Sequence, residues 1–214
     1  MSVIRQPEVL GRTTRRRVVG VTAALSATAV ETLAVGLWFG LVIGPRTTST
    51  ALAGLGILFC GSLLRAGVFG MTVSDDGDLI QPRRLGAALL LTTGWVVWLW
   101  VAELIDGVPG LVVATVVLVW ILVVQFSVER RVFRCRITPQ VADAPIGPAL
   151  LLAAGAATLL VSAWFVEWTA TSPALSLGVT SFVVWIDALH LGVFVFVLFS
   201  FLAHQHRFQR LLNP

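Results

Sequence analysis

Long apolar segments follow one another along most of this chain, and they constrain its fold more than any motif does. A helix needs roughly 20 mostly apolar residues to cross about 30 Å of hydrocarbon. Because a backbone inside lipid must satisfy its own hydrogen bonds, and because the segments are continuously apolar rather than alternating, the sequence predicts an all-α bundle of transmembrane helices. Six segments qualify, approximately residues 18–43, 51–73, 86–105, 109–128, 148–168 and 174–203.

The composition excludes soluble classes of protein. Of the 214 residues, 57% are hydrophobic and only 12% are charged, whereas soluble domains carry about 25% charged residues. This is too little polar surface to cover a globule in water. Every basic residue is Arg and none is Lys, which excludes a Lys Schiff base and which we interpret as the bias of a GC-rich prokaryotic genome.

The arginines predict the orientation of the bundle. With six spans, all of them except Arg46 and Arg65 fall on one side, and cytoplasmic loops carry the excess of basic residues. The sequence therefore predicts a protein of the cytoplasmic membrane with both termini inside. This orientation explains the pI of about 10.9 without a nucleic-acid partner. We expect an Arg-rich cytoplasmic segment at 1–17, the transmembrane domain at 18–203 and a short cytoplasmic tail at 204–214.

The start of the first span has two interpretations. Arg15, Arg16 and Arg17 precede an apolar stretch and resemble a twin-arginine export signal, with Ala27-Thr28-Ala29 as its cleavage site. Apolar sequence continues to Ile43, however, and the rest of the chain is already polytopic. We interpret the segment as an uncleaved first helix, and the cleaved alternative stays open.

Four ionisable residues within the predicted spans form the candidate site. They are Glu31, Arg65, Asp187 and His190, with the last two at i and i+3 on one helix face. Each charge at a helix centre costs about 2.5–3.5 kcal/mol on insertion scales, so such residues are expected to be functional. One interpretation is a proton- or cation-linked site. The other is a structural clamp in which Arg65 bridges the carboxylates.

Aromatic and acidic residues near the outer ends of the spans form a second candidate. The residues are Glu103, Trp164, Glu167 and Trp168. An outer vestibule of this composition would attract a cation through charge and cation–π contacts. The alternative is an aromatic belt at the membrane interface, where Trp is enriched in most membrane proteins.

Small residues repeat at helical spacing, as in Gly36, Gly40 and Gly44. Such faces let helices approach closely in lipid. They serve packing within the bundle, or the docking of a membrane-protein partner or of a second copy of the chain.

The sequence thus favours a small transporter or channel-like protein with a proton- or cation-linked polar site. The alternative is a non-catalytic membrane subunit or scaffold, and an intramembrane enzyme comes third because no nucleophile and base form a complete set. We expect no cofactor and no metal. His204 and His206, at i and i+2, lie on different helix faces and are interpreted as interfacial side chains. The lipid bilayer is the expected environment, and the sequence names no substrate.

Overall fold

Six long helices make up most of the protein. The computed structural model describes residues 7–44, 47–73, 82–132, 145–173, 175–177, 180–183 and 185–212. Each of the six helices is long and apolar enough to cross a membrane, as expected of a multi-pass membrane protein. The helices are α1 (Pro7–Ile43), α2 (Thr48–Val73), α3 (Pro82–Ile105), α4 (Gly107–Val132), α5 (Ile146–Trp164) and α6 (Ala188–Leu212).

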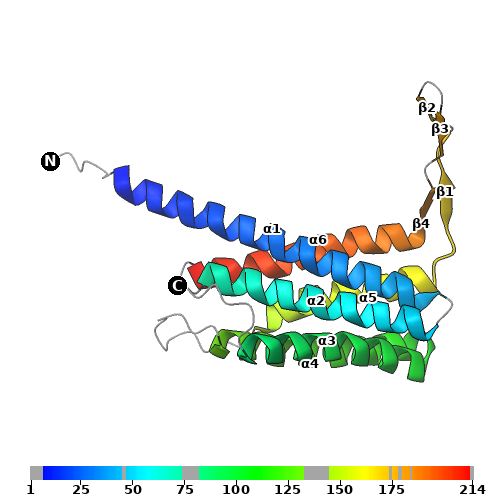
Figure 1. Cartoon of the computed structure of the whole chain (residues 1–214), viewed down its shortest axis with the longest axis horizontal. Helices are drawn as coiled ribbons and strands as arrows, with labels where there is room; N and C mark the ends of the chain where they lie inside the picture. Colours follow the sequence, from blue (N-terminus) through cyan, green and yellow to red (C-terminus); the bar gives the residue numbers. More distant parts are fainter. Residues whose placement is uncertain are drawn as a thin grey trace.

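The helices form a closed ring. Each one packs against the next along the chain, and α6 packs back against α1. Figure 1 shows the six helices running nearly along one axis, with the first turn of α1 and the last turn of α6 at the same end of the bundle. This arrangement leaves a shared interior that side chains from all parts of the ring can reach.

Short turns join the helices at the opposite end. Asp106 and Gly107 have positive φ angles of 60° and 61°, and the Gly107 N–H donates to Asp106 Oδ1 at 2.7 Å. A Cβ at Gly110 would lie 2.6 Å from the Ala102 carbonyl oxygen, so α3 and α4 approach closely here. Before α2, the Thr50 N–H donates to Thr47 Oγ1 at 3.1 Å and satisfies one free donor of the first turn.

The sixth predicted span was wrong in its first half. Residues 174–203 were expected to form one helix, but α6 begins at Ala188. The segment before it pairs as two small antiparallel sheets, β1 with β4 and β2 with β3. The described residues between 165 and 187 therefore form a ribbon that runs across the bundle axis at the end of α5 (Figure 1). The strands are β1 (Thr169–Thr171), β2 (Leu175–Leu177), β3 (Thr180–Phe182) and β4 (Trp185–Asp187).

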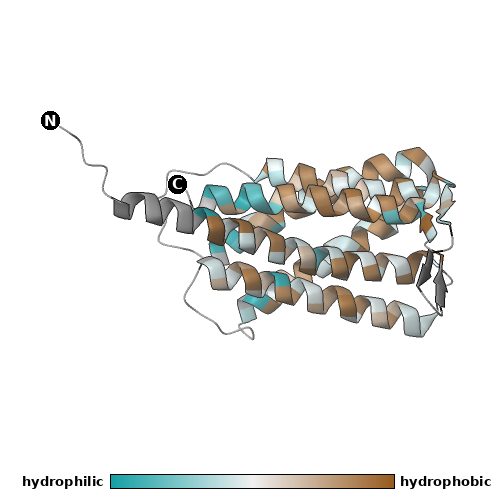
Figure 2. Ribbon diagram, turned by 90° about the horizontal axis from the view of Figure 1, so that it is seen from above, coloured by the Kyte–Doolittle hydropathy of each residue, from teal (hydrophilic) through white to brown (hydrophobic). Residues whose placement is uncertain are grey.

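The interior of the ring is aromatic toward the ribbon end. Phe39, Trp95, Trp98 and Phe196 are all at most 1% exposed. The Trp95 ring meets those of Trp98 and Phe196 edge to face, with centroids 5.5 and 5.8 Å apart. Figure 2 shows hydrophilic residues on several helices in the other half of the bundle, toward the end where the C-terminus lies. The ring is thus closed by aromatic rings in one half and carries polar residues in the other.

Candidate functional site

A buried arginine joins two carboxylates inside the ring. Arg65, on α2, donates from Nη1 to Glu31 Oε1 at 3.3 Å and from Nη2 to Glu129 Oε1 at 2.6 Å. Glu31 lies on α1 and Glu129 on α4. The contact between Glu31 and Arg65 that the sequence suggested is therefore present, and Glu129 is a partner that the sequence analysis did not include.

A histidine and a serine from α6 complete the surroundings of Glu31. His204 Nε2 lies 2.6 Å from Glu31 Oε2, and Ser200 Oγ donates to the same oxygen at 3.3 Å. His204 was expected to be an interfacial side chain, and this was wrong, because its side chain is only 1% exposed. The other ring nitrogen, Nδ1, has no hydrogen-bond partner among the described residues.

A second arginine holds the far side of Glu129. Arg207 Nη2 donates to Glu129 Oε2, and Gln125 Nε2 donates to Oε1 at 2.8 Å. The guanidinium of Arg207 lies 3.9 Å from the centroid of the Phe126 ring, which also contacts Arg65 at 5.8 Å. Both guanidiniums therefore lie within cation–π distance of the same aromatic ring.

These contacts form one continuous series, Arg207–Glu129–Arg65–Glu31–His204, which we call the ion-pair chain. Its side chains are 1–5% exposed. Arginines and glutamates alternate along it and His204 ends it, so Glu129 lies between two cations and Glu31 lies between Arg65 and an imidazole. Removing such groups from water costs several kcal/mol per ion, which close pairing and added hydrogen bonds offset. The alternation explains how five ionisable side chains are buried together.

The ion-pair chain extends from one end of the bundle toward its middle. Glu129 and Arg207 lie within about two turns of the ends of α4 and α6. Glu31 lies well inside α1, and its distance from Ile43 along the helix is about 18 Å at 1.5 Å per residue. The ion-pair chain also crosses the ring of helices, because Arg65 on α2 contacts Glu129 on α4 and these two helices are not neighbours in the ring.

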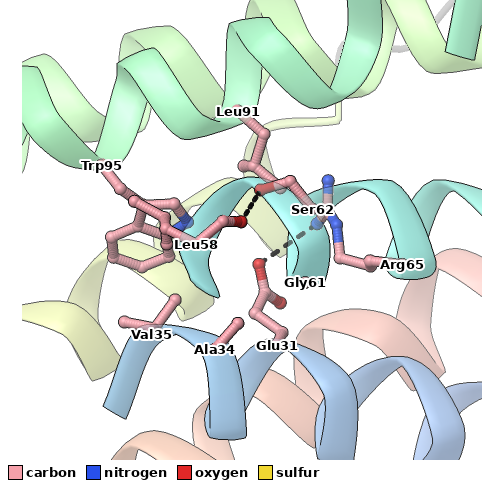
Figure 3. A pocket seen from close by; sticks show the side chains of 9 residues that line it. All are labelled: Glu31, Ala34, Val35, Leu58, Gly61, Ser62, Arg65, Leu91 and Trp95. Carbon is pink, nitrogen blue, oxygen red and sulfur yellow. Dashed lines mark hydrogen bonds and ion pairs between the residues drawn. The ribbon is translucent and has the colours of Figure 1, made fainter. Parts of the chain in front are cut away.

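A small cavity adjoins the inner end of the ion-pair chain. Its volume of about 10 Å³ is close to the smallest that holds one water molecule. Figure 3 shows the Glu31 carboxylate and the Arg65 guanidinium on one side and the Trp95 ring on the other. It is lined by Glu31, Ala34, Val35, Leu58, Gly61, Ser62, Arg65, Leu91 and Trp95.

Asp187 and His190 do not join Glu31 and Arg65. They lie at the end of β4 and in the first turn of α6, with side chains 47% and 64% exposed. The His190 N–H donates to Asp187 Oδ1 at 3.0 Å, which caps the helix. This bond lowers the pKa of Asp187 below its ordinary value. The two residues contact each other at 2.5 Å, but expecting them near the membrane centre was wrong, because α6 starts only at Ala188.

The residues of the expected outer vestibule lie near the ribbon end of the bundle. Glu103 is in the last turn of α3, and Trp164 ends α5. Glu167 and Trp168 follow in the exposed start of the ribbon, where Trp168 is 46% exposed. These positions agree with either an outer vestibule or an interfacial aromatic belt, so cation binding there stays a prediction.

The residues of the ion-pair chain that the sequence analysis did not include still have a signal in the sequence. Ser200, His204 and Arg207 stand at i, i+4 and i+7, which places them on one face of a helix that continues an apolar span. Gln125 and Glu129 stand at i and i+4 on α4. Ending the fourth span at 128 and the sixth at 203 placed Glu129, His204 and Arg207 outside the predicted membrane region.

The site holds arginines, carboxylates and one imidazole. Within the described ranges no three His, Cys, Asp or Glu residues are grouped so as to hold a metal ion. Cys60 is a free, exposed thiol on α2, and Cys135 lies outside the described residues. Comparison with protein-family models, with curated proteins and with solved structures finds no match to this chain.

Proposed function

We propose that this protein is a small proton-coupled membrane transporter in which the Glu31–His204 pair holds the exchangeable proton. The observation that carries the proposal is the 2.6 Å contact between Glu31 Oε2 and His204 Nε2, with both side chains 1% exposed. An imidazole gains and loses a proton near neutral pH. Ionisable residues inside membrane spans commonly mark proton and ion pathways.

Adding this proton changes the net charge of the ion-pair chain, and that change can alter how the helices pack. The charges of two arginines and two glutamates cancel, so the ion-pair chain has no net charge when His204 is neutral. A proton added to the Glu31–His204 pair leaves one net positive charge beside Arg65. That charge weakens the Glu31–Arg65 ion pair, which connects α1 with α2. Proton binding would thereby favour a different packing of these helices, which is what coupling to a substrate requires.

We also propose that both termini face the cytoplasm in the cytoplasmic membrane. The Arg-rich helix ends support this orientation: the start of α1, the start of α3, the end of α4 and the end of α6 lie at one end of the bundle (Figure 1). Single cysteines at Ser172 and Arg210, in a chain with Cys60 and Cys135 replaced by Ser, test the orientation. An impermeant maleimide added to intact cells is expected to label the first and spare the second. The reverse pattern contradicts the orientation.

Proton movement is tested in proteoliposomes that contain the purified protein. An imposed potassium diffusion potential drives protons inward, and a trapped pH-sensitive dye reports acidification. We expect wild-type vesicles to acidify and the Glu31→Gln and His204→Gln variants to match protein-free vesicles. Asp187→Asn and His190→Gln are the matched controls, because they disrupt a carboxylate–imidazole pair that is exposed at the end of the bundle. Size-exclusion profiles and helical circular dichroism check that each variant folds.

Acidification by folded Glu31→Gln and His204→Gln protein at the wild-type rate would contradict the proposal. Equal loss in the two control variants would also contradict it, because the effect would then not belong to the buried pair. No acidification by the wild-type protein would leave the ion-pair chain as a structural clamp.

A second candidate function is a non-catalytic subunit or scaffold of a membrane complex. The ribbon favours it, because Val183, Trp185 and Ile186 are 47%, 70% and 41% exposed and large exposed apolar groups mark contact surfaces. Native mass spectrometry of protein extracted gently from its own membrane tests this candidate. A stoichiometric second polypeptide that a Trp185→Ala variant loses would support it, and a bare monomer would oppose it.

A further inference from the structure

The cavity beside Glu31 is lined by a buried hydrogen-bond donor that has no partner in the described part of the chain. Trp95, on α3, is 1% exposed, and its indole Nε1–H has no hydrogen-bond partner among the described residues. Figure 3 shows the nitrogen edge of the ring turned toward the side of the cavity where Glu31, Ser62 and Arg65 lie. A buried donor in this position normally finds a partner, either a protein group or an ordered water molecule.

The polar groups across the cavity can receive such a partner. Glu31 Oε1 accepts one hydrogen bond, from Arg65, at the long distance of 3.3 Å. Ser62 Oγ donates to the Leu58 carbonyl oxygen at 2.8 Å and accepts from Thr92 Oγ1 at 3.2 Å, which leaves it one further acceptor lone pair. A buried water is stable where it has two to four polar partners. The cavity offers Trp95 as donor and Glu31 and Ser62 as acceptors.

The size of the cavity selects the ligand. A volume of about 10 Å³ corresponds to one water molecule and excludes larger molecules. Apart from Arg65, which is paired with Glu31 and Glu129, the remaining lining side chains are apolar and offer no competing hydrogen bonds: Ala34, Val35, Leu58 and Leu91.

We infer that this cavity binds a single water molecule, which accepts a hydrogen bond from Trp95 Nε1–H and donates to the Glu31 carboxylate. The water extends the polar path of the ion-pair chain by one step into the aromatic half of the ring. Its presence does not depend on transport. Any part it plays in passing a proton to Glu31 rests on the proposed function.

The chain contains a matched control for this inference. Trp98 is also buried, at 0% exposure, and its Nε1–H likewise has no hydrogen-bond partner among the described residues. Trp98 does not line the cavity. The two indoles therefore differ in access to the proposed water and share the same helix and the same burial.

The experiment is nuclear magnetic resonance of the full chain in detergent micelles with ¹⁵N-labelled tryptophan. Trp95→Phe and Trp98→Phe variants assign the two indole N–H signals. We expect a direct through-space cross-peak between the Trp95 N–H and a water proton, and none for Trp98. A Trp95 signal without that cross-peak overturns the inference, and so does an equal cross-peak for Trp98.

A second measurement covers the case in which Trp95→Phe does not fold. A structure of the wild-type protein at a resolution that shows ordered waters is expected to contain one solvent peak within hydrogen-bond distance of both Trp95 Nε1 and Glu31 Oε1. An empty cavity in that structure overturns the inference. Neither measurement uses proton flux, so a failed water site and a failed transport proposal remain distinguishable.

Discussion

Arg65 donates from Nη2 to Glu129 Oε1 at 2.6 Å and so connects α2 to α4 across the interior of the ring. The same guanidinium donates from Nη1 to Glu31 on α1. Arg65 is therefore the residue at which three helices meet. A planar guanidinium can hold two carboxylates at once, whereas a lysine ammonium is a single point charge.

Replacing Glu129 by Gln tests whether this connection stabilises the bundle. The variant removes the carboxylate that the buried Arg65 and Arg207 share, and leaves Arg65 paired with Glu31. Removing one partner from a buried ion pair costs about 3–5 kcal/mol. We expect a clear fall in the thermal unfolding temperature in detergent. Glu167→Gln, at an exposed position, is the control, and equal unfolding temperatures for the two variants would contradict a stabilising role of the ion-pair chain.

A double-mutant cycle measures the coupling between Glu31 and Arg65. The single variants Glu31→Gln and Arg65→Gln and the double variant are compared in free energy of unfolding. Residues in one ion-pair network couple by about 0.5–3 kcal/mol, and we expect a value in that range. The comparison cycle pairs Asp187→Asn with Arg65→Gln, for which we expect additivity because Asp187 lies outside the network. Additivity in the first cycle would show that the contact contributes no coupling.

Gly61 is required for the close approach of α1 and α2 beside the site. A Cβ at Gly61 would lie 2.1 Å from Ala34 Cβ, whereas a Cβ at Gly56 on the same helix meets nothing within 4 Å. We expect Gly61→Ala to destabilise the protein by about 1–3 kcal/mol through overpacking. Gly56→Ala is expected to be neutral or to stabilise by up to about 1 kcal/mol through helix propensity. Chemical unfolding of both variants checks this, and indistinguishable results would contradict the tight contact.

The helix cap at Asp187 predicts a local dependence on pH. The His190 backbone N–H that donates to its carboxylate lowers the pKa of Asp187. A carboxylate with a lowered folded-state pKa contributes stability that is fully present above its unfolded pKa, about 3.9, and is lost as the pH falls through the folded value. We expect the first turn of α6 to lose hydrogen-exchange protection only in that acidic range. Asp187→Asn should remove the dependence, and an unchanged profile in that variant would contradict this cause.

Most of the bundle could be predicted from the sequence, because a membrane-spanning helix is recognised by the length and hydrophobicity of its segment. Five of the predicted spans coincide closely with helices, and Glu31 and Arg65 contact each other as one interpretation required. The sixth span was misplaced because hydropathy does not distinguish an apolar helix from an apolar ribbon. A strand forms its hydrogen bonds with another segment of the chain, whereas a helix forms them locally. Here Thr169 in β1 pairs with Asp187 in β4, and hydropathy carries no information about such a pairing. That error moved the expected centre of the last span to Asp187 and His190.

The sequence alone determined that this chain contains six helices able to cross a membrane and that Glu31 and Arg65 lie within them, because transfer of apolar side chains to lipid depends on local composition. The tertiary structure decided which charges meet. Glu129 and Arg207 are 78 positions apart, and Glu31 and His204 are 173 positions apart. Only the closure of the ring, with α6 against α1, brings such groups together. A buried charge is stable only beside its partner, and the partner is chosen by packing between helices rather than by distance along the chain.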